Sequence, residues 1–214
     1  SSEPRKGVYT TDMAEMSPRE RVYAAVRYRH PDRIPWTLNF GWTQGLTPQF
    51  HEIFTKVTGI EDYNEYYNFD IRPVDSAIRL NPAIMEKLDY YYPERPENWG
   101  WDFAGYGVMT APWPTMPYAE MYFYPLAKTT NVKDIEEFPK PLIDPSRTIE
   151  QTKALHERGL AAVAYSAAGY ELCWLLRGME QFMIDLVTDP IITGAVTEWV
   201  TEVVTSIAVA HARA

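Results

Sequence analysis

The chain has 214 residues, of which 46% are hydrophobic and 23% are charged, a composition typical of an ordinary globular protein. Its formal net charge of −9 argues against nucleic acid or an anionic membrane as the main partner, because both require clustered lysine and arginine. The single cysteine, Cys173, excludes an intramolecular disulfide. The sequence shows neither a secretory signal nor a long apolar run, so we expect a cytoplasmic protein without a membrane span.

Four helices are predicted from one sequence device, a capping side chain followed by proline. The capping oxygen accepts a hydrogen bond from a free N–H, and the proline occupies a helical position that needs no donor. The four starts are Ser17-Pro18, with Glu20 completing a capping box, Thr47-Pro48, Asp144-Pro145 and Asp189-Pro190. Gly59 and Gly159 are expected to end the second and third helices. Apolar residues from Ile192 to Ile207 follow a period of 3.6 and predict that the last helix is the longest.

Short apolar runs between these helices predict strands over 34–40, 74–80 and 160–166, the last followed by a helix over 170–176. Alternating strands and helices predict βαβ units and a parallel sheet. The segment 81–141 is rich in proline and aromatic residues, and we expect it to contain an antiparallel ribbon of 103–109 and 118–124. Three parallel strands cannot cover their own faces and edges, whereas a closed barrel needs eight strands. The chain is therefore expected to be the first part of a larger α/β architecture.

Three segments resemble members of the uroporphyrinogen decarboxylase superfamily. The run MSPRERVYAAVRYRHPDRIPW (16–36) is similar to the start of these proteins, YPLAKTTNVKDIEEFPKP (124–141) to a central segment, and LLRGMEQFMIDLVTDP (175–190) to a later helix and its following cap. The resemblance implies a (β/α)8 TIM barrel that is incomplete in this chain. Residues 1–16 would be an N-terminal extension and 17–214 the N-terminal part of one domain, with an insertion at about 81–141.

The resemblance implies two activities that different side chains support. The decarboxylase removes carboxyl groups from a tetrapyrrole and holds its propionates with the arginines of an RQAGR motif. The corresponding place here reads LNFGWTQG (38–45), and no arginine lies between Arg33 and Arg72. Because a polycarboxylate requires cationic side chains, we expect the other branch, methyl transfer in a corrinoid (cobalamin)-dependent system. The alternatives are a carboxy-lyase of the uroporphyrinogen decarboxylase type, or a non-catalytic half-barrel or corrinoid-docking module completed by a partner chain.

The candidate site residues come from the resemblance and from the expected strand ends. Phe69-Asp70-Ile71 is similar to the context of the decarboxylase's aspartate, which implies a catalytic role for Asp70; a cap before Arg72-Pro73 is the alternative. Arg72 is expected either to bind an anionic group or to pair with Asp70 or Asp75. Active sites of α/β barrels form at the carboxyl ends of the strands. The further substrate-binding candidates are therefore Asn39, Trp42, Gln44, Tyr165, Ser166 and Glu171, although Glu171 also suits the first turn of a helix.

The four histidines are scattered and show no metal-binding spacing, so we expect no metal site and no required cofactor within the chain. The zinc ligands of the methyltransferase branch would lie beyond Ala214. The expected partners are a corrinoid protein or a small-molecule methyl donor or acceptor, together with a second copy or a C-terminal half chain. A barrel site is assembled from several strand ends, so the isolated chain is predicted to be weakly active or inactive.

Overall fold

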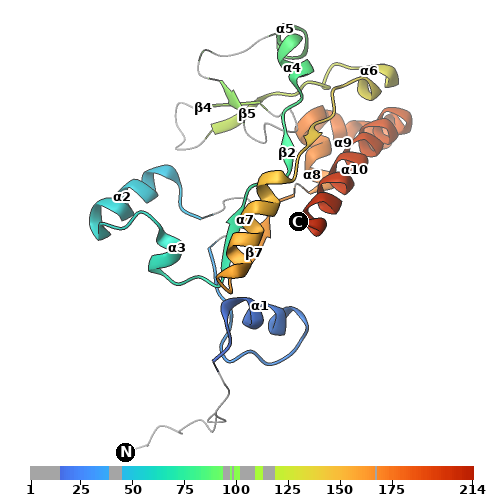
Figure 1. Cartoon of the computed structure of the whole chain (residues 1–214). Coiled ribbons are helices and arrows are strands. Elements are labelled where there is room, and N and C mark those ends of the chain that lie inside the picture. The colour runs from blue at the N-terminus through green and yellow to red at the C-terminus, as the bar shows by residue number, and fades with distance from the viewer. Residues whose placement is uncertain are drawn as a thin grey trace, which may run out of the picture. The chain divides into compact units, whose positions relative to one another are not determined.

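The computed structural model describes residues 15–38, 45–93, 97, 99–101, 109–112, 119–166 and 168–214. The chain divides into two compact units, each of which is described by itself. The first comprises residues 1–74 and 150–163, and the second comprises 75–149 and 164–214. The first unit contains α1 (Pro18–Val26), α2 (Pro48–Thr58), α3 (Tyr63–Tyr66), β1 (Ile71–Val74), most of α7 (Ser146–Glu157) and β7 (Ala161–Ala164). The second contains β2 (Ile78–Arg79), α4 (Pro82–Glu86), α5 (Leu88–Tyr91), β3 (Gly100–Trp101), β4 (Met109–Pro112), β5 (Ala119–Phe123), α6 (Val132–Glu136), β6 (Leu142–Ile143), α8 (Gly169–Arg177), α9 (Met179–Thr188) and α10 (Pro190–Arg213), in the order coloured in Figure 1.

The predicted helix starts are confirmed. Ser17 and Glu20 form the capping box of α1, and the side chains of Thr47 and Asp189 accept hydrogen bonds from the first turns of α2 and α10. In α7 the carboxylate of Asp144 accepts from the N–H of Ser146, where the helix begins. Gly59 and Gly159 follow α2 and α7 with φ of 73° and 71°, a left-handed backbone that glycine adopts without steric cost.

The strands form three small sheets, β1–β7, β2–β6 and β3–β4–β5. The described chain is therefore mixed helix and sheet, and its strands do not close into a barrel within the described residues. The pair β2–β6 is antiparallel, whereas the alternation of strands and helices predicted a parallel sheet. The pairs β3–β4 and β4–β5 are also antiparallel, and for β4–β5 this is the predicted arrangement. The predicted strand 160–166 is confirmed in β7, and the predicted ribbon is present as β4 and β5; residues 103–108 and 118 lie outside the described part.

Two predicted strands differ from the structure. Residues 34–38 form no strand, and 39–40 lie outside the described residues. The N–H of Trp36 donates to the carboxylate of Asp70, and the N–H of Asp70 donates to the carbonyl of Trp36, so a side chain replaces part of a strand ladder. The predicted strand 74–80 is divided into the end of β1 and the short β2. Between them the N–H of Ala77 donates to a histidine side chain rather than to a neighbouring strand.

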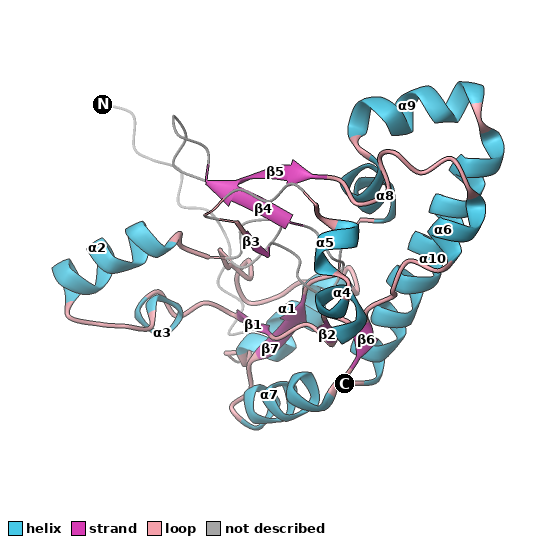
Figure 2. Cartoon of the chain, turned by 90° about the horizontal axis from the view of Figure 1, so that it is seen from above, coloured by secondary structure: helices cyan, strands magenta, loops and turns pink. Residues whose placement is uncertain are grey.

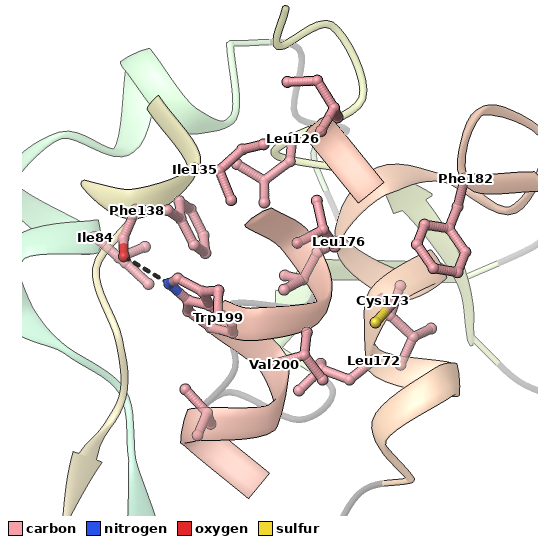
Figure 3. Close-up of a cluster of buried hydrophobic side chains, with 14 of the residues drawn as sticks. Ile84, Leu126, Ile135, Phe138, Leu172, Cys173, Leu176, Phe182, Trp199 and Val200 are labelled. Atoms are coloured by element: carbon pink, nitrogen blue, oxygen red, sulfur yellow. Dashed lines mark hydrogen bonds between the residues drawn. The ribbon is translucent and has the colours of Figure 1, made fainter. Parts of the chain in front are cut away.

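One hydrophobic core holds the second unit together. The helices α8, α9 and α10 contact one another, and α6 lies alongside α10 (Figure 2). Trp199 of α10 packs against Phe138 and donates its indole N–H to the carbonyl of Phe138 at 3.0 Å (Figure 3). This bond allows a buried tryptophan to satisfy its only donor. The predicted apolar stripe of α10 is buried in this core through Ile192, Val196, Trp199, Val200, Val203 and Ile207.

Within the described residues, α10 is the one helix long and apolar enough to cross a membrane by length and composition. A core helix passes the same test. Of its most apolar stretch 33% is buried inside the protein, and the buried side chains recur at the spacing of a helix face. This periodic burial is typical of a helix that covers a protein core.

Candidate functional site

A buried ion-pair network lies in the first unit and begins at Arg21 of α1. Its Nε donates to Oδ1 of Asp32 at 2.6 Å, and its Nη2 donates to Oδ2 of the same carboxylate at 2.8 Å. This two-point geometry is the strong form of an arginine–carboxylate pair. The bond from Arg21 holds the pKa of Asp32 well below its usual range. The third nitrogen, Nη1, donates to Oδ1 of Asp70 at 2.6 Å, so one arginine joins two carboxylates.

Asp70, the predicted catalytic residue, is fully buried in this network. Arg33 donates through Nη1 to Oδ2 at 2.7 Å and through Nη2 to Oδ1 at 2.9 Å, and the N–H of Trp36 donates to Oδ2 at 2.9 Å. Both carboxylate oxygens are therefore occupied by cationic and backbone donors. A buried carboxylate with this many donors holds segments of the chain together. Contact between Asp70 and a substrate would require the network to open, and its catalytic role stays a prediction.

Arg72 lies in β1 and is nearly fully buried. It donates to the carbonyl of Phe69 and pairs with Glu65 at 3.5 Å, so neither Asp70 nor Asp75, the two partners considered from the sequence, is its carboxylate. Among the described residues its Nε has no hydrogen-bond partner. A buried donor without a partner is unfavourable, which keeps Arg72 a candidate for binding an anionic group.

A serine–histidine cluster lies in the second unit. His211, near the end of α10, places Nδ1 at 3.1 Å from Oγ of Ser166. Its Nε2 lies 2.9 Å from the N of Ala77 and 3.3 Å from Oγ of Ser76. A backbone N–H can only donate, so Nε2 accepts and the proton of the neutral imidazole sits on Nδ1. His211 therefore donates to Ser166, which excludes it as the base that would activate this serine in the present arrangement.

Burial supports the same protonation state, because it lowers the pKa of His211 and favours the neutral imidazole.

Tyr165 is half-buried directly after β7 and directly before Ser166. Glu171 lies in the first turn of α8, and partial burial raises its carboxyl pKa. The cause is that burial disfavours the charged carboxylate.

The eight predicted site residues are distributed over both units. Asp70 and Arg72 belong to the first unit, and Tyr165, Ser166 and Glu171 belong to the second. Asn39, Trp42 and Gln44 lie outside the described residues. Sequence reasoning missed His211, because its two hydrogen-bonding serines are 135 and 45 residues away along the chain and no local motif joins them.

The described part of the chain contains no group of three or more histidine, cysteine, aspartate or glutamate side chains that could hold a metal ion. Cys173 is buried in α8, and burial raises the pKa of its thiol to about 11. A thiol with so high a pKa is protonated and unreactive at neutral pH. Cys173 therefore contributes to the core.

A second buried network lies in the second unit and joins two of the segments that resemble the superfamily. Arg177 donates through Nε to Oδ2 of Asp185 at 2.7 Å. Its Nη1 donates to the carbonyls of Leu126, Ala127 and Thr129 in the turn that precedes α6. One arginine therefore links the helix pair α8–α9 to the segment 124–141.

Comparison with family models, curated proteins and solved structures finds no match to this chain.

Proposed function

We propose that the chain is the N-terminal part of a (β/α)8 enzyme similar to the uroporphyrinogen decarboxylase superfamily, and that this enzyme transfers methyl groups to or from a corrinoid. The observation that carries the proposal is that charged residues of the three resembling segments form buried ion pairs and hydrogen bonds. Arg21, Asp32 and Arg33 of the first segment form the network around Asp70. Arg177 of the third segment binds the carbonyls of the second. The residues shared with the superfamily thus have a physical reason to occur together.

The arginines that surround Asp70 favour methyl transfer over tetrapyrrole decarboxylation. Arg21 and Arg33 are committed to Asp32 and Asp70, whereas Arg72 is paired with Glu65 and keeps one buried nitrogen for an anionic group. A polycarboxylate tetrapyrrole requires free cationic forks to neutralise it. Corrinoid side chains are mainly amides, which bind through neutral hydrogen-bonding groups. The tetrapyrrole carboxylates need positive charge from the protein and the corrinoid amides do not, so a chain of net charge −9 suits the corrinoid better.

The second unit supplies the groups that would contact the substrate. Tyr165 and Ser166 follow β7 and offer two hydroxyl groups, and Glu171 lies a few residues later in α8. In the transfer, an electron pair of the acceptor forms the new bond to the methyl carbon, and the electron pair of the broken cobalt–carbon bond stays on the corrinoid. The chain's own residues would orient the donor and move a proton of the acceptor. Glu171, with its raised pKa, is our candidate for that proton transfer.

The proposal is tested by giving the chain both substrates in parallel. One sample receives methylcobalamin with a thiol acceptor, and methylated thiol is measured by mass spectrometry; the other receives uroporphyrinogen, and coproporphyrinogen is measured by chromatography. We expect a slow methyl transfer that falls further in Glu171→Gln, with no porphyrinogen product. Coproporphyrinogen formation would replace the proposal by the carboxy-lyase. Binding of methylcobalamin without any transfer would instead support a docking module.

A further inference from the structure

The helix α9 exposes an unusual amount of apolar surface. Of its ten residues only Phe182 and Asp185 are buried. The large apolar side chains that remain on its surface are 46–85% exposed, and they are Met179, Met183, Ile184, Leu186 and Val187. Met179, Met183 and Val187 recur every four residues and lie along one stripe of the helix. A contiguous apolar surface on a folded domain commonly marks a place where another molecule binds.

A shallow groove of about 660 Å³ lies between Leu186, near the end of α9, and residues of α10. Figure 2 shows how α9 turns into α10 at this corner. The α10 part of its lining combines small side chains with Glu198 and Glu202. Its lining includes Leu186, Pro190, Thr193, Gly194, Thr197 and Glu198. We call the exposed stripe of α9 together with this groove the α9–α10 face.

Gly194 is the second observation that points to an external ligand. It lies inside a helix of 24 residues, where glycine is markedly less favourable than alanine. A Cβ atom at this position would meet no heavy atom within 4 Å, so packing within the described chain gives no reason for a glycine. The missing side chain does, however, let another backbone approach α10 closely within the groove that Gly194 lines.

The charge around the α9–α10 face indicates what kind of molecule it fits. From Gly178 to Ala210 the sequence contains five acidic residues and no lysine, arginine or histidine. Asp185 is neutralised by Arg177, and Glu202 by Lys140. Glu180 and Glu198 are exposed and form no ion pair within the described part of the chain. Such a surface repels anionic lipid headgroups and attracts a cationic partner.

We propose that the α9–α10 face binds an amphipathic, lysine- or arginine-rich helix of a partner protein. The apolar side of that helix would pack on Met183, Leu186 and Val187, and its backbone would approach α10 at Gly194. Its cationic side chains would face Glu180 and Glu198. This arrangement is the helix-in-groove mode of recognition, in which methionine side chains adapt to the incoming apolar surface. The inference does not depend on the proposed methyl transfer.

The test uses a synthetic helix of leucine and lysine, with leucine at helical spacing, as the probe for the full chain. Binding is followed by fluorescence anisotropy at low and high salt. We expect saturable binding that weakens as the salt concentration rises. In Val187→Ser and in Gly194→Leu the affinity should fall about tenfold, which corresponds to about 1.4 kcal/mol of binding free energy. Leucine is a good helix former, so Gly194→Leu should fill the groove without unfolding α10. Ile53→Ser, at an exposed position of α2, is the matched control and should bind as the unchanged chain does.

Several results would contradict the proposal, and two of them would identify another occupant of the α9–α10 face. Equal binding of a leucine–glutamate helix would exclude the proposed role of charge. Unchanged affinity in Gly194→Leu would exclude the groove, and absence of binding by the unchanged chain would overturn the proposal outright. Dimers that dissociate on Val187→Ser, measured by light scattering, would identify a second copy as the occupant. Adsorption to phosphatidylserine vesicles that is lost in Val187→Ser would identify a membrane.

Discussion

At the scale of single residues, Asp70 is the clearest case of a polar side chain whose surroundings decide its role. It is fully buried, and Arg21, which binds it, is 3% exposed. Breaking a buried ion pair by removing one partner leaves an uncompensated charge and typically costs about 3–5 kcal/mol. We therefore expect Asp70→Asn to lower the free energy of unfolding by about 3 kcal/mol, measured by urea denaturation. Glu137→Gln, which removes an exposed pair with Lys133, should cost less than about 0.5 kcal/mol. A loss in Asp70→Asn no larger than in Glu137→Gln would contradict the structural role.

His211 gives a prediction about pH. Its pKa is lowered in the folded chain, so the unfolded chain binds the proton more readily. The corresponding stability is present above the ordinary value of 6.5 and is lost as the pH falls through the lowered pKa of the folded state. Between about pH 7.5 and about pH 5.5, the unchanged chain should lose more unfolding free energy than His211→Gln, because protonated Nε2 cannot accept from Ala77. Equal losses in the two proteins would show that this histidine does not contribute.

The sequence predicts individual polar residues of the site better than it predicts their partners. Ser166 and Asp70 are candidates from the sequence because Ser166 ends a predicted strand and Asp70 lies in a motif similar to that of the superfamily. The partners of Asp70 are 49 and 37 residues away, and His211 is 45 residues from Ser166. Such pairings depend on how the elements pack, and neither composition nor spacing contains that information.

At the scale of helices and strands, local signals predict what local physics determines. The capping side chains and prolines of α1, α2 and α10 define these starts because the first turn of a helix needs nothing from the rest of the chain. The predicted strand over 34–40 depended instead on a neighbour. The N–H of Trp36 donates to the carboxylate of Asp70 instead of to a neighbouring strand, and the apolar run alone does not predict this hydrogen bond. The pairing of β2 with β6 likewise joins residues far apart in sequence.

The interior glycine of α10 yields a stability prediction that is separate from binding. Gly194→Ala should raise the free energy of unfolding by about 1 kcal/mol, because alanine loses less backbone entropy in a helix and its Cβ would meet open space. Thermal or chemical unfolding followed by circular dichroism measures this change. A destabilised Gly194→Ala would show that the position is closely packed, which would also remove the argument that an external helix approaches there.

At the scale of the whole molecule, the described candidate site residues belong to two different compact units. Asp70 and Arg72 lie in the first unit, and Tyr165, Ser166 and Glu171 lie in the second. We propose the resemblance to a (β/α)8 enzyme as the reason why Arg21 and Arg33 meet Asp70 and why Arg177 binds the carbonyls of Leu126 and Thr129. It also makes one demand on the complete chain. If the enzyme handles a corrinoid, the residues that follow β7 must recognise it.

Titration of the full chain with methylcobalamin, followed by the visible absorbance of the corrinoid and by tryptophan fluorescence, tests this demand most directly. We expect a saturable change in both signals, weakened in the double variant Tyr165→Phe, Ser166→Ala, which removes the two hydroxyl groups after β7. His211→Gln, which removes the partner of Ser166 without removing either hydroxyl, is the matched control for altered packing. Absence of any change in absorbance and fluorescence at high methylcobalamin concentration would contradict the corrinoid assignment.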